Sequence, residues 1–180
     1  MSVLQQIRER ASKLGKTIVL PEGEEQRVIE AASILAREGI AKVILLGDPE
    51  NIFGKAKEAD LTNVTILDYL HSDKMESYVR KFTELRKKKG MTPEKAAEIM
   101  KDPLYFGAMM VKMGDADGMT AGSVHATGDV LRPAFQIIKT APGISVVSSC
   151  FVMELPDSRY GDDGVLVFGD CGVNPDPTAE

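Results

Sequence analysis

Residues 117–133 read DGMTAGSVHATGDVLRP, and this stretch indicates the fold class and where a ligand site is expected. Its first part, residues 118–121, predicts a short strand, and residues 130–139 have the apolar spacing of a helix. Two glycines and several hydroxyl side chains lie between them. A strand that leads through such a loop into a helix is typical of an open α/β sheet, where ligands bind beyond the carboxyl ends of the strands.

We therefore expect this loop to bind an anion. A helix N-terminus presents free N–H groups and a partial positive charge. Gly122 and Gly128 allow the backbone to approach phosphate oxygens closely. Ser123 and Thr127 add hydroxyl donors, and Arg132 adds a bidentate donor. The alternative is a glycine-containing loop with an ordinary helix cap, and the sequence alone does not separate the two.

His125 lies in the same loop. It could donate to a phosphoryl or carbonyl oxygen, act as an acid or base, or only hydrogen-bond the loop that carries it. Asp129 would be unfavourable beside a bound phosphate. We expect Asp129 to pair with Arg132, because residues three apart are neighbours on a helix face.

Two other segments carry charge. Residues 84–90, ELRKKKG, end a helix with four consecutive basic residues, which are typical of a solvated helix end but would also suit a polyanionic cofactor. Residues 21–27, PEGEEQR, follow the first predicted strand. We expect their glutamates to stabilise the following helix N-terminus, with Arg27 as a candidate to point toward the strand ends.

Outward from these segments, helical and strand patterns alternate. Apolar spacing predicts four more helices, over residues 2–14, 27–38, 73–89 and 104–113, and Thr92-Pro93 begins a further one. Apolar runs predict strands at residues 17–20, 42–46, 64–67, 144–153 and 165–170. This order predicts a mostly parallel sheet covered on both faces, a three-layer αβα fold. The last two strands, joined by a turn over 156–164, place a domain change near residues 143–150, with segments 1–145 and 146–180.

Composition excludes several classes. The chain has 180 residues, 43% of them apolar, and a net charge of −5, which argues against nucleic acid as a partner. It contains no GxxxxGK[ST], G-x-G-x-x-G or G-x-S-x-G motif. Cys150 and Cys171 lie in apolar runs and are expected to be reduced core thiols. With two histidines and no Cys/His spacing, no metal site is expected.

The N-terminus lacks the apolar segment of a secretory signal, and no apolar run reaches the roughly 18 residues of a membrane span. We therefore expect a cytoplasmic protein without membrane attachment.

Four strings together resemble the phosphate acetyl- and butyryltransferase family: TIVLPEGEEQR, ELRKKKGMTPEKAAEIM, YFGAMMVKMGDADGMTAGSVHATGDVLRPAFQIIKTAPG and VFGDCGVNPDPTAE. The last string favours the acetyl enzyme. The resemblance implies two α/β domains around a cleft, similar to isocitrate and isopropylmalate dehydrogenases, and a homodimer or higher oligomer. It implies the reaction acetyl-CoA plus phosphate giving acetyl phosphate plus CoA, with coenzyme A as a substrate, no tightly bound cofactor and no metal.

The resemblance also assigns residues. Substrate phosphates are implied at Arg132 and at the loop residues Gly122, Ser123, His125 and Thr127. A coenzyme A phosphate is implied at Arg86, and the basic run adds Lys87 and Lys89 to that site.

The chain departs from the family in length. Family chains are nearly twice as long, and their later DLSRG-type segment, which orients the substrates and assists thiol deprotonation, is missing here. We expect an apparently truncated first domain plus the opening strands of a second, inactive alone, with His125 the only candidate base. The alternatives are a phosphate butyryltransferase, a non-catalytic phosphate- and CoA-binding fragment, a structural fragment, and a related decarboxylating dehydrogenase.

Overall fold

A computed structural model describes residues 2–144, 146–169 and 171–173 of the chain. The chain divides into two compact units, one of Met1–Ile7 with Thr140–Glu180 and one of Arg8–Lys139. The boundary predicted near residue 145 concerns the domains of the whole protein and stays a prediction.

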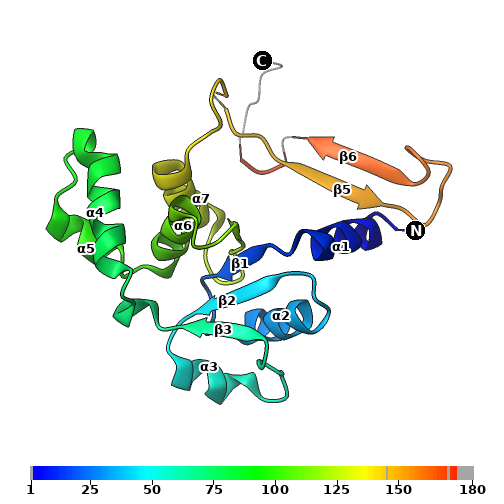
Figure 1. The fold of residues 1–180 in the computed structure, drawn as a ribbon. Coiled ribbons are helices and arrows are strands. Elements are labelled where there is room, and N and C mark those ends of the chain that lie inside the picture. The colour runs from blue at the N-terminus through cyan, green and yellow to red at the C-terminus, as the bar shows by residue number, and fades with distance from the viewer. Residues whose placement is uncertain (1, 145, 170, 174–180) are drawn as a thin grey trace. The chain divides into compact units, whose positions relative to one another are not determined.

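The larger unit is built on a four-stranded parallel sheet (Figure 1). Its order is β3-β2-β1-β4, and its strands are β1 (Thr17–Leu20), β2 (Lys42–Leu46), β3 (Val64–Leu67) and β4 (Gly118–Met119). Ile18 lies opposite Val43 on one side and Gly118 on the other. The predicted mostly parallel sheet is confirmed, and β4 is two residues shorter than expected.

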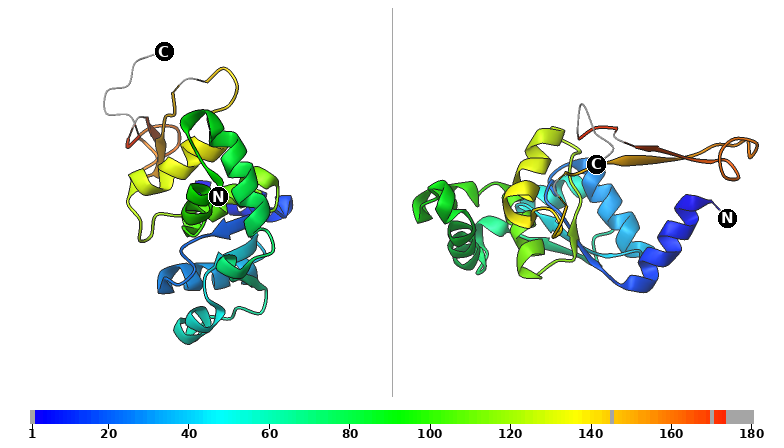
Figure 2. Two further views of the ribbon diagram at one scale, coloured as in Figure 1. Left: turned by 90° about the vertical axis from the view of Figure 1, so that its left-hand side faces the viewer. Right: turned by 90° about the horizontal axis from the view of Figure 1, so that it is seen from above.

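Helices cover both faces of this sheet (Figure 2). Side chains of α2 (Gln26–Arg37) and α3 (Pro49–Ala56) pack with Leu20 and Leu45. On the other face α4 (Met75–Arg86), α5 (Pro93–Ile99) and α6 (Pro103–Met113) contribute to a cluster with Val19 and Leu46. Successive residues of one strand therefore enter different cores, as expected of a strand buried on both faces.

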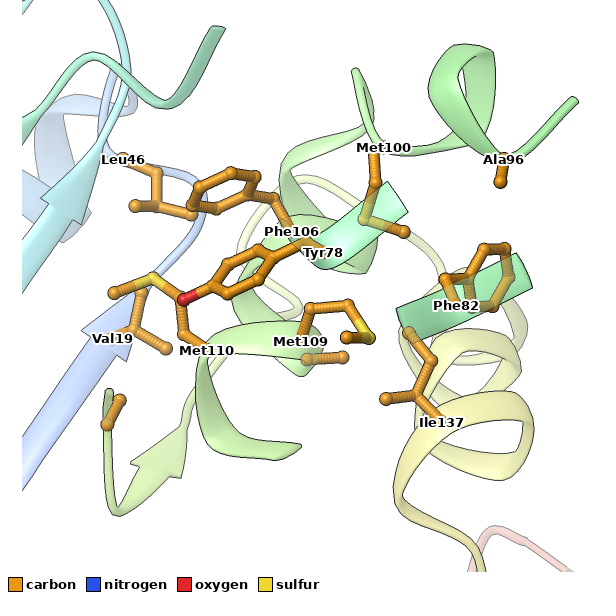
Figure 3. Close-up of a cluster of buried hydrophobic side chains, with 12 residues drawn as sticks. Val19, Leu46, Tyr78, Phe82, Ala96, Met100, Phe106, Met109, Met110 and Ile137 are labelled. Carbon is orange, nitrogen blue, oxygen red and sulfur yellow. The ribbon is translucent and has the colours of Figure 1, made fainter. Parts of the chain in front are cut away.

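The second cluster has an aromatic centre (Figure 3). The rings of Tyr78 and Phe106 have centroids 4.9 Å apart, and the Tyr78 hydroxyl donates to Asp115 at 2.6 Å. Met109 and Met110 are buried beside them, whereas Met113 at the end of the same helix is exposed. Such unbranched side chains suit irregular gaps between aromatic rings.

Local signals explain where helices begin. The Thr92 hydroxyl accepts from the Lys95 N–H at 3.4 Å, so the predicted cap is confirmed. Helix α3 is not among the helices expected from the sequence, because Gly47-Asp48-Pro49 also suits a turn. Asp48 accepts from the Glu50 N–H at 2.8 Å and Pro49 occupies the first turn, which is equally a helix start.

The first and last α-helices of the chain, α1 and α7, differ in how closely their bounds match the sequence predictions. Helix α1 spans Val3–Leu14, close to the predicted 2–14. Helix α7 spans Thr127–Pro133 and continues as a π-helical segment, Ala134–Ile138, so it begins three residues earlier than predicted.

In the smaller unit, β5 (Cys150–Glu154) and β6 (Val165–Gly169) form the predicted antiparallel pair. Strand β5 begins at Cys150 rather than at residue 144. The expectation of core thiols is wrong: every residue of β5 is exposed, Cys150 included, and Cys171 is half-buried. Within the described residues, no helix has the length and apolar character needed to span a bilayer.

Candidate functional site

Glu22 and the loop of residues 122–125 meet at the carboxyl edge of the sheet. Glu22 follows β1 after a single proline, and the loop follows β4, the strand that pairs directly with β1. The chain therefore leaves two neighbouring strands at the same edge. The Glu22 side chain is only 3% exposed there.

The Glu22 carboxylate is surrounded by donors from the loop. Its Oε2 accepts from the N–H groups of Gly122 at 2.9 Å and Ser123 at 2.8 Å. Its Oε1 accepts from the N–H groups of Val124 and His125, each at 2.9 Å, and lies 2.8 Å from the His125 Nδ1. Five donors thus satisfy one buried anion, as a buried charge requires.

This arrangement keeps Glu22 ionised. Burial by itself raises the pKa of the Glu22 carboxyl, but hydrogen bonds from the backbone of His125 and Val124, the His125 ring and the Ser123 backbone lower that pKa from 4.5 to about 2. The Glu22 side chain is therefore an ionised carboxylate at neutral pH.

The loop thus binds an anion that belongs to the chain itself. The amides of residues 122–125, which we expected to face a phosphate, hydrogen-bond Glu22 instead. Gly122 has a φ of +109°, a backbone conformation that residues other than glycine rarely adopt. This conformation helps to turn the amides toward one point. The hydroxyls of Ser123 and Thr127 remain candidate donors for an external phosphate, and that part stays a prediction.

Arg27 also points to this loop. Its Nη2 donates to the Ser123 carbonyl at 2.9 Å, and its Nε donates to the Glu25 carboxylate at 2.6 Å. Glu24 accepts from the Asp48 N–H at 3.1 Å, next to the start of α3. Glu22, in contrast, hydrogen-bonds the loop amides of residues 122–125, so it is not the ordinary helix-end carboxylate that we expected.

Arg132 pairs with Asp129 as predicted, with 3.7 Å between Nη2 and Oδ1. The Arg132 side chain is 63% exposed, so it is accessible to a ligand. Sequence reasoning gave no indication of Tyr105 on α6, which senses the charge of Arg132. Burial raises the pKa of the Tyr105 hydroxyl, while the charges of Arg132 and Arg86 oppose that rise. The positive charges of both arginines therefore act on one tyrosine.

Arg86 ends α4, and its Nε is buried without a hydrogen-bond partner in the part of the chain that the structure describes. The next three residues, Lys87–Lys89, form a 3-10 turn whose side chains are exposed, closed by Gly90 at a φ of +75°. The structure thus leaves Lys87 and Lys89 in solvent, while part of Arg86 is buried.

Two cavities border Glu22. One, of about 330 Å³, is lined by His125 together with Tyr69, Pro103 and the residues that follow β1. The other, of about 580 Å³, is largely apolar and lies between α1, α2 and β1. No group of three His, Cys, Asp or Glu residues that could hold a metal ion occurs among the described residues.

Sequence reasoning missed Glu22 and Tyr105 for different reasons. Glu22 is one of three glutamates in residues 21–27, and only the pairing of β1 with β4 distinguishes it from the other two. Tyr105 is one residue of a helix, and what singles it out is that the charges of two arginines far apart in the chain both act on its hydroxyl.

Comparisons with known proteins agree with one another. The sequence profile described as phosphate acetyl/butaryl transferase matches residues 2–180. Phosphate acetyltransferases of Thermoanaerobacterium thermosaccharolyticum and Acetivibrio thermocellus are 53% and 54% identical over all of this chain, which covers 55% and 54% of their lengths. A crystal structure of a phosphotransacetylase from Streptococcus pyogenes superposes with a TM-score of 0.88 at 38% identity, over 99% of this chain and 54% of that one. The chain thus spans about half the length of the relatives it matches.

Proposed function

This chain belongs to the phosphate acetyl/butaryl transferase family, and on that premise we propose that the protein it forms part of transfers an acetyl group reversibly between coenzyme A and inorganic phosphate. The observation that carries the proposal is the match over residues 2–180, with relatives named phosphate acetyltransferase at 53% and 54% identity. Those names favour an acetyl over a butyryl substrate.

Arg86 and Arg132, whose charges both act on Tyr105, support a site for phosphate groups. We propose that Arg132 binds the transferred phosphate, with the hydroxyls of Ser123 and Thr127 as further donors. Arg86 would bind a phosphate of coenzyme A, with Lys87 and Lys89 adding long-range attraction. Guanidinium groups bind phosphate bidentately, whereas exposed ammonium groups act as point charges.

The chemistry follows from the substrates. The thiol of coenzyme A must lose its proton, and its sulfur then attacks the acetyl carbonyl of acetyl phosphate while the phosphate leaves with the bonding electrons. An ordinary thiol has a pKa of about 8.5, so it is mostly protonated at neutral pH and needs a base. Both substrates must also be held together, because positioning supplies roughly 7–11 kcal/mol of such a barrier.

The finer fold and assembly are part of the same proposal. We propose that the whole protein has two α/β domains around a cleft, in the manner of isocitrate and isopropylmalate dehydrogenases, and acts as a homodimer. The parallel sheet with helices on both faces supports the first domain.

The test is a coupled assay of acetyl phosphate formation from acetyl-CoA and phosphate. It compares this chain with a version extended to the length of its relatives. We expect turnover from the extended version and little from the 180 residues, because part of the cleft would be missing. An extended protein that folds, yet transfers no acetyl group to phosphate, would refute the proposal.

A further inference from the structure

The loop of residues 122–125 is folded around an anion that the chain itself supplies. Four backbone N–H groups and the His125 ring converge on the Glu22 carboxylate, and the Glu22 side chain is only 3% exposed. Successive backbone N–H groups that point to one place form a concave site of the kind that binds free anions. In this chain a side chain fills the site, so Glu22 acts as an internal ligand of the loop.

The sheet fixes Glu22, and Glu22 in turn fixes the loop. Gly23 lies so close to β2 that an added Cβ would be 2.5 Å from the Leu46 carbonyl oxygen, which holds the backbone next to Glu22 in place. Residues 121–125 belong to no helix or strand. Among the described residues, all hydrogen bonds of this segment go to Glu22 or Arg27. The conformation of the loop therefore depends on these two side chains.

These contacts leave one polar group of Ser123 available to a ligand. The Ser123 N–H donates to Glu22 at 2.8 Å, and the Ser123 carbonyl accepts from Arg27 at 2.9 Å. The peptide groups on both sides of this residue are therefore fixed. The Ser123 hydroxyl has no hydrogen-bond partner in the part of the chain that the structure describes. A donor whose backbone is already ordered loses less entropy when it binds a ligand.

The charge of Glu22 does not prevent an anion from binding to this loop. Five donors surround the buried carboxylate, so a phosphate at the Ser123 hydroxyl would not meet an uncompensated negative charge. An amide in place of the carboxylate would change the loop, because glutamine offers one acceptor oxygen where glutamate offers two. In Glu22→Gln, an NH₂ group would face N–H groups that now have an acceptor.

We propose that Glu22 is a positioning residue, an internal carboxylate ligand that holds residues 122–125 in the conformation in which Ser123 binds the substrate phosphate. The inference rests on the proposed acetyl transfer and its phosphate site. Glu22 exchanges no proton and makes no bond to the substrate. Its removal should leave an empty site for a small carboxylate. Acetate matches the CH₂–COO⁻ group that Glu22→Ala removes.

The first experiment uses this 180-residue chain and needs no activity. In Glu22→Ala, the amides of residues 122–125 should exchange hydrogen faster than in wild type. Acetate should restore their protection and raise the melting temperature of the variant. Sodium chloride at the same ionic strength should do neither, because chloride cannot present two oxygens to the four N–H groups. Amides that stay protected in Glu22→Ala without acetate would overturn the proposal.

Glu24→Ala is the matched control for this experiment. It removes the same group one residue further on, but the Glu24 side chain is 41% exposed and accepts from the Asp48 N–H. We expect the amides of residues 122–125 to keep their protection in Glu24→Ala, and acetate to have no effect on that variant or on wild type. A response to acetate in all three proteins would show binding elsewhere and count against the site.

The second experiment uses the extended protein and separates positioning from stability. Glu22→Gln should raise the KM for phosphate about tenfold, because loop N–H groups lose their acceptor, and leave the KM for acetyl-CoA unchanged. A variant that is only less stable would contain less active enzyme and keep both KM values. In a Ser123→Ala background, Glu22→Gln should raise the KM for phosphate much less, since both changes then affect one interaction. Equal effects in the two backgrounds would overturn the role through Ser123.

These outcomes are distinguishable from failure of the proposed function. If the extended wild type transfers no acetyl group, the function fails and with it the role of Glu22 in phosphate binding, whatever hydrogen exchange shows for the loop. If the wild type is active and Glu22→Gln keeps its KM for phosphate, the function stands and the positioning role is overturned. Should Glu22→Ala not fold at any acetate concentration, the kinetics of Glu22→Gln decide.

Discussion

The Nδ1 of His125 lies 2.8 Å from the Oε1 of Glu22, although the two residues are 103 positions apart in the chain. The contact exists because β1 and β4 are neighbours in the sheet, and the segments that follow both strands turn at its carboxyl edge. It converts a loop that resembles an anion site into one that already contains a carboxylate.

Replacing Arg132 by Ala should weaken phosphate binding by roughly 1.5 kcal/mol, the low end for a charge-assisted bond, because this side chain is 63% exposed. Isothermal titration with inorganic phosphate, on the extended protein, measures the change. Lys57→Ala is the matched control, since Lys57 follows α3, on the opposite face of the sheet from α4 and α6, and also removes one charge. Equal affinities in the two variants would remove Arg132 from the site.

Replacing Arg86 by Ala should raise the Michaelis constant for coenzyme A and flatten its dependence on salt. The reason is that the variant loses the guanidinium proposed to bind a cofactor phosphate and one charge of the basic run, whose exposed lysines are screened over about 8–10 Å at physiological ionic strength. Initial rates between low and high salt test this. An unchanged Michaelis constant and slope would mean that the run is only a solvated helix end.

Stability should depend on pH through Glu22. Its folded pKa of about 2 lies below the ordinary 4.5, so the stabilisation is complete above about pH 4.5 and is lost as pH falls toward 2. The shift corresponds to about 3 kcal/mol. We expect the free energy of unfolding of wild type to fall over that window more steeply than that of Glu22→Gln, in urea titrations at successive pH values. Parallel curves would contradict the shift.

Gly23 should not tolerate a side chain. A Cβ added there would lie 2.5 Å from the carbonyl oxygen of Leu46, which is backbone and cannot move aside cheaply. We expect Gly23→Ala to cost about 1–3 kcal/mol of stability. Gly54→Ala is the control: none of the described atoms lies within 4 Å of its added Cβ, and a helical glycine should gain about 0.5–1 kcal/mol. Thermal unfolding of both variants decides.

The parts of the fold that could be predicted are those with local signals. The bounds of β1, β2 and β3 follow from short apolar runs, and the caps at Thr92 and Gly114 follow from residues with special backbone preferences. Helix α3 was missed because Asp48-Pro49 suits a turn and a helix start equally well. Such ambiguity is removed only by the buried Ile52, which needs the helix to reach the core.

The site could be predicted only in part. Arg132 with Asp129 is a local pair and was predicted. The partner of the loop amides could not be, because which of three glutamates reaches them depends on the pairing of β1 with β4. The same holds for Tyr105, whose hydroxyl senses the charges of two arginines that are 46 residues apart in the chain. Non-local geometry of this kind leaves no periodic trace in the sequence.

The contact between Glu22 and the 122–125 loop also has a consequence for the order of folding. Strands β1 and β2 pair residues only 25 positions apart, such as Thr17 with Lys42, whereas the loop must wait until a segment about four times longer has closed. Closing a longer segment costs more entropy before any contact repays it, so the loop should form late. In pulse-labelled hydrogen exchange during refolding, the amides of residues 122–125 should gain protection after those of β2. Until they do, the Glu22 carboxylate has no partners, and its burial opposes folding rather than assisting it.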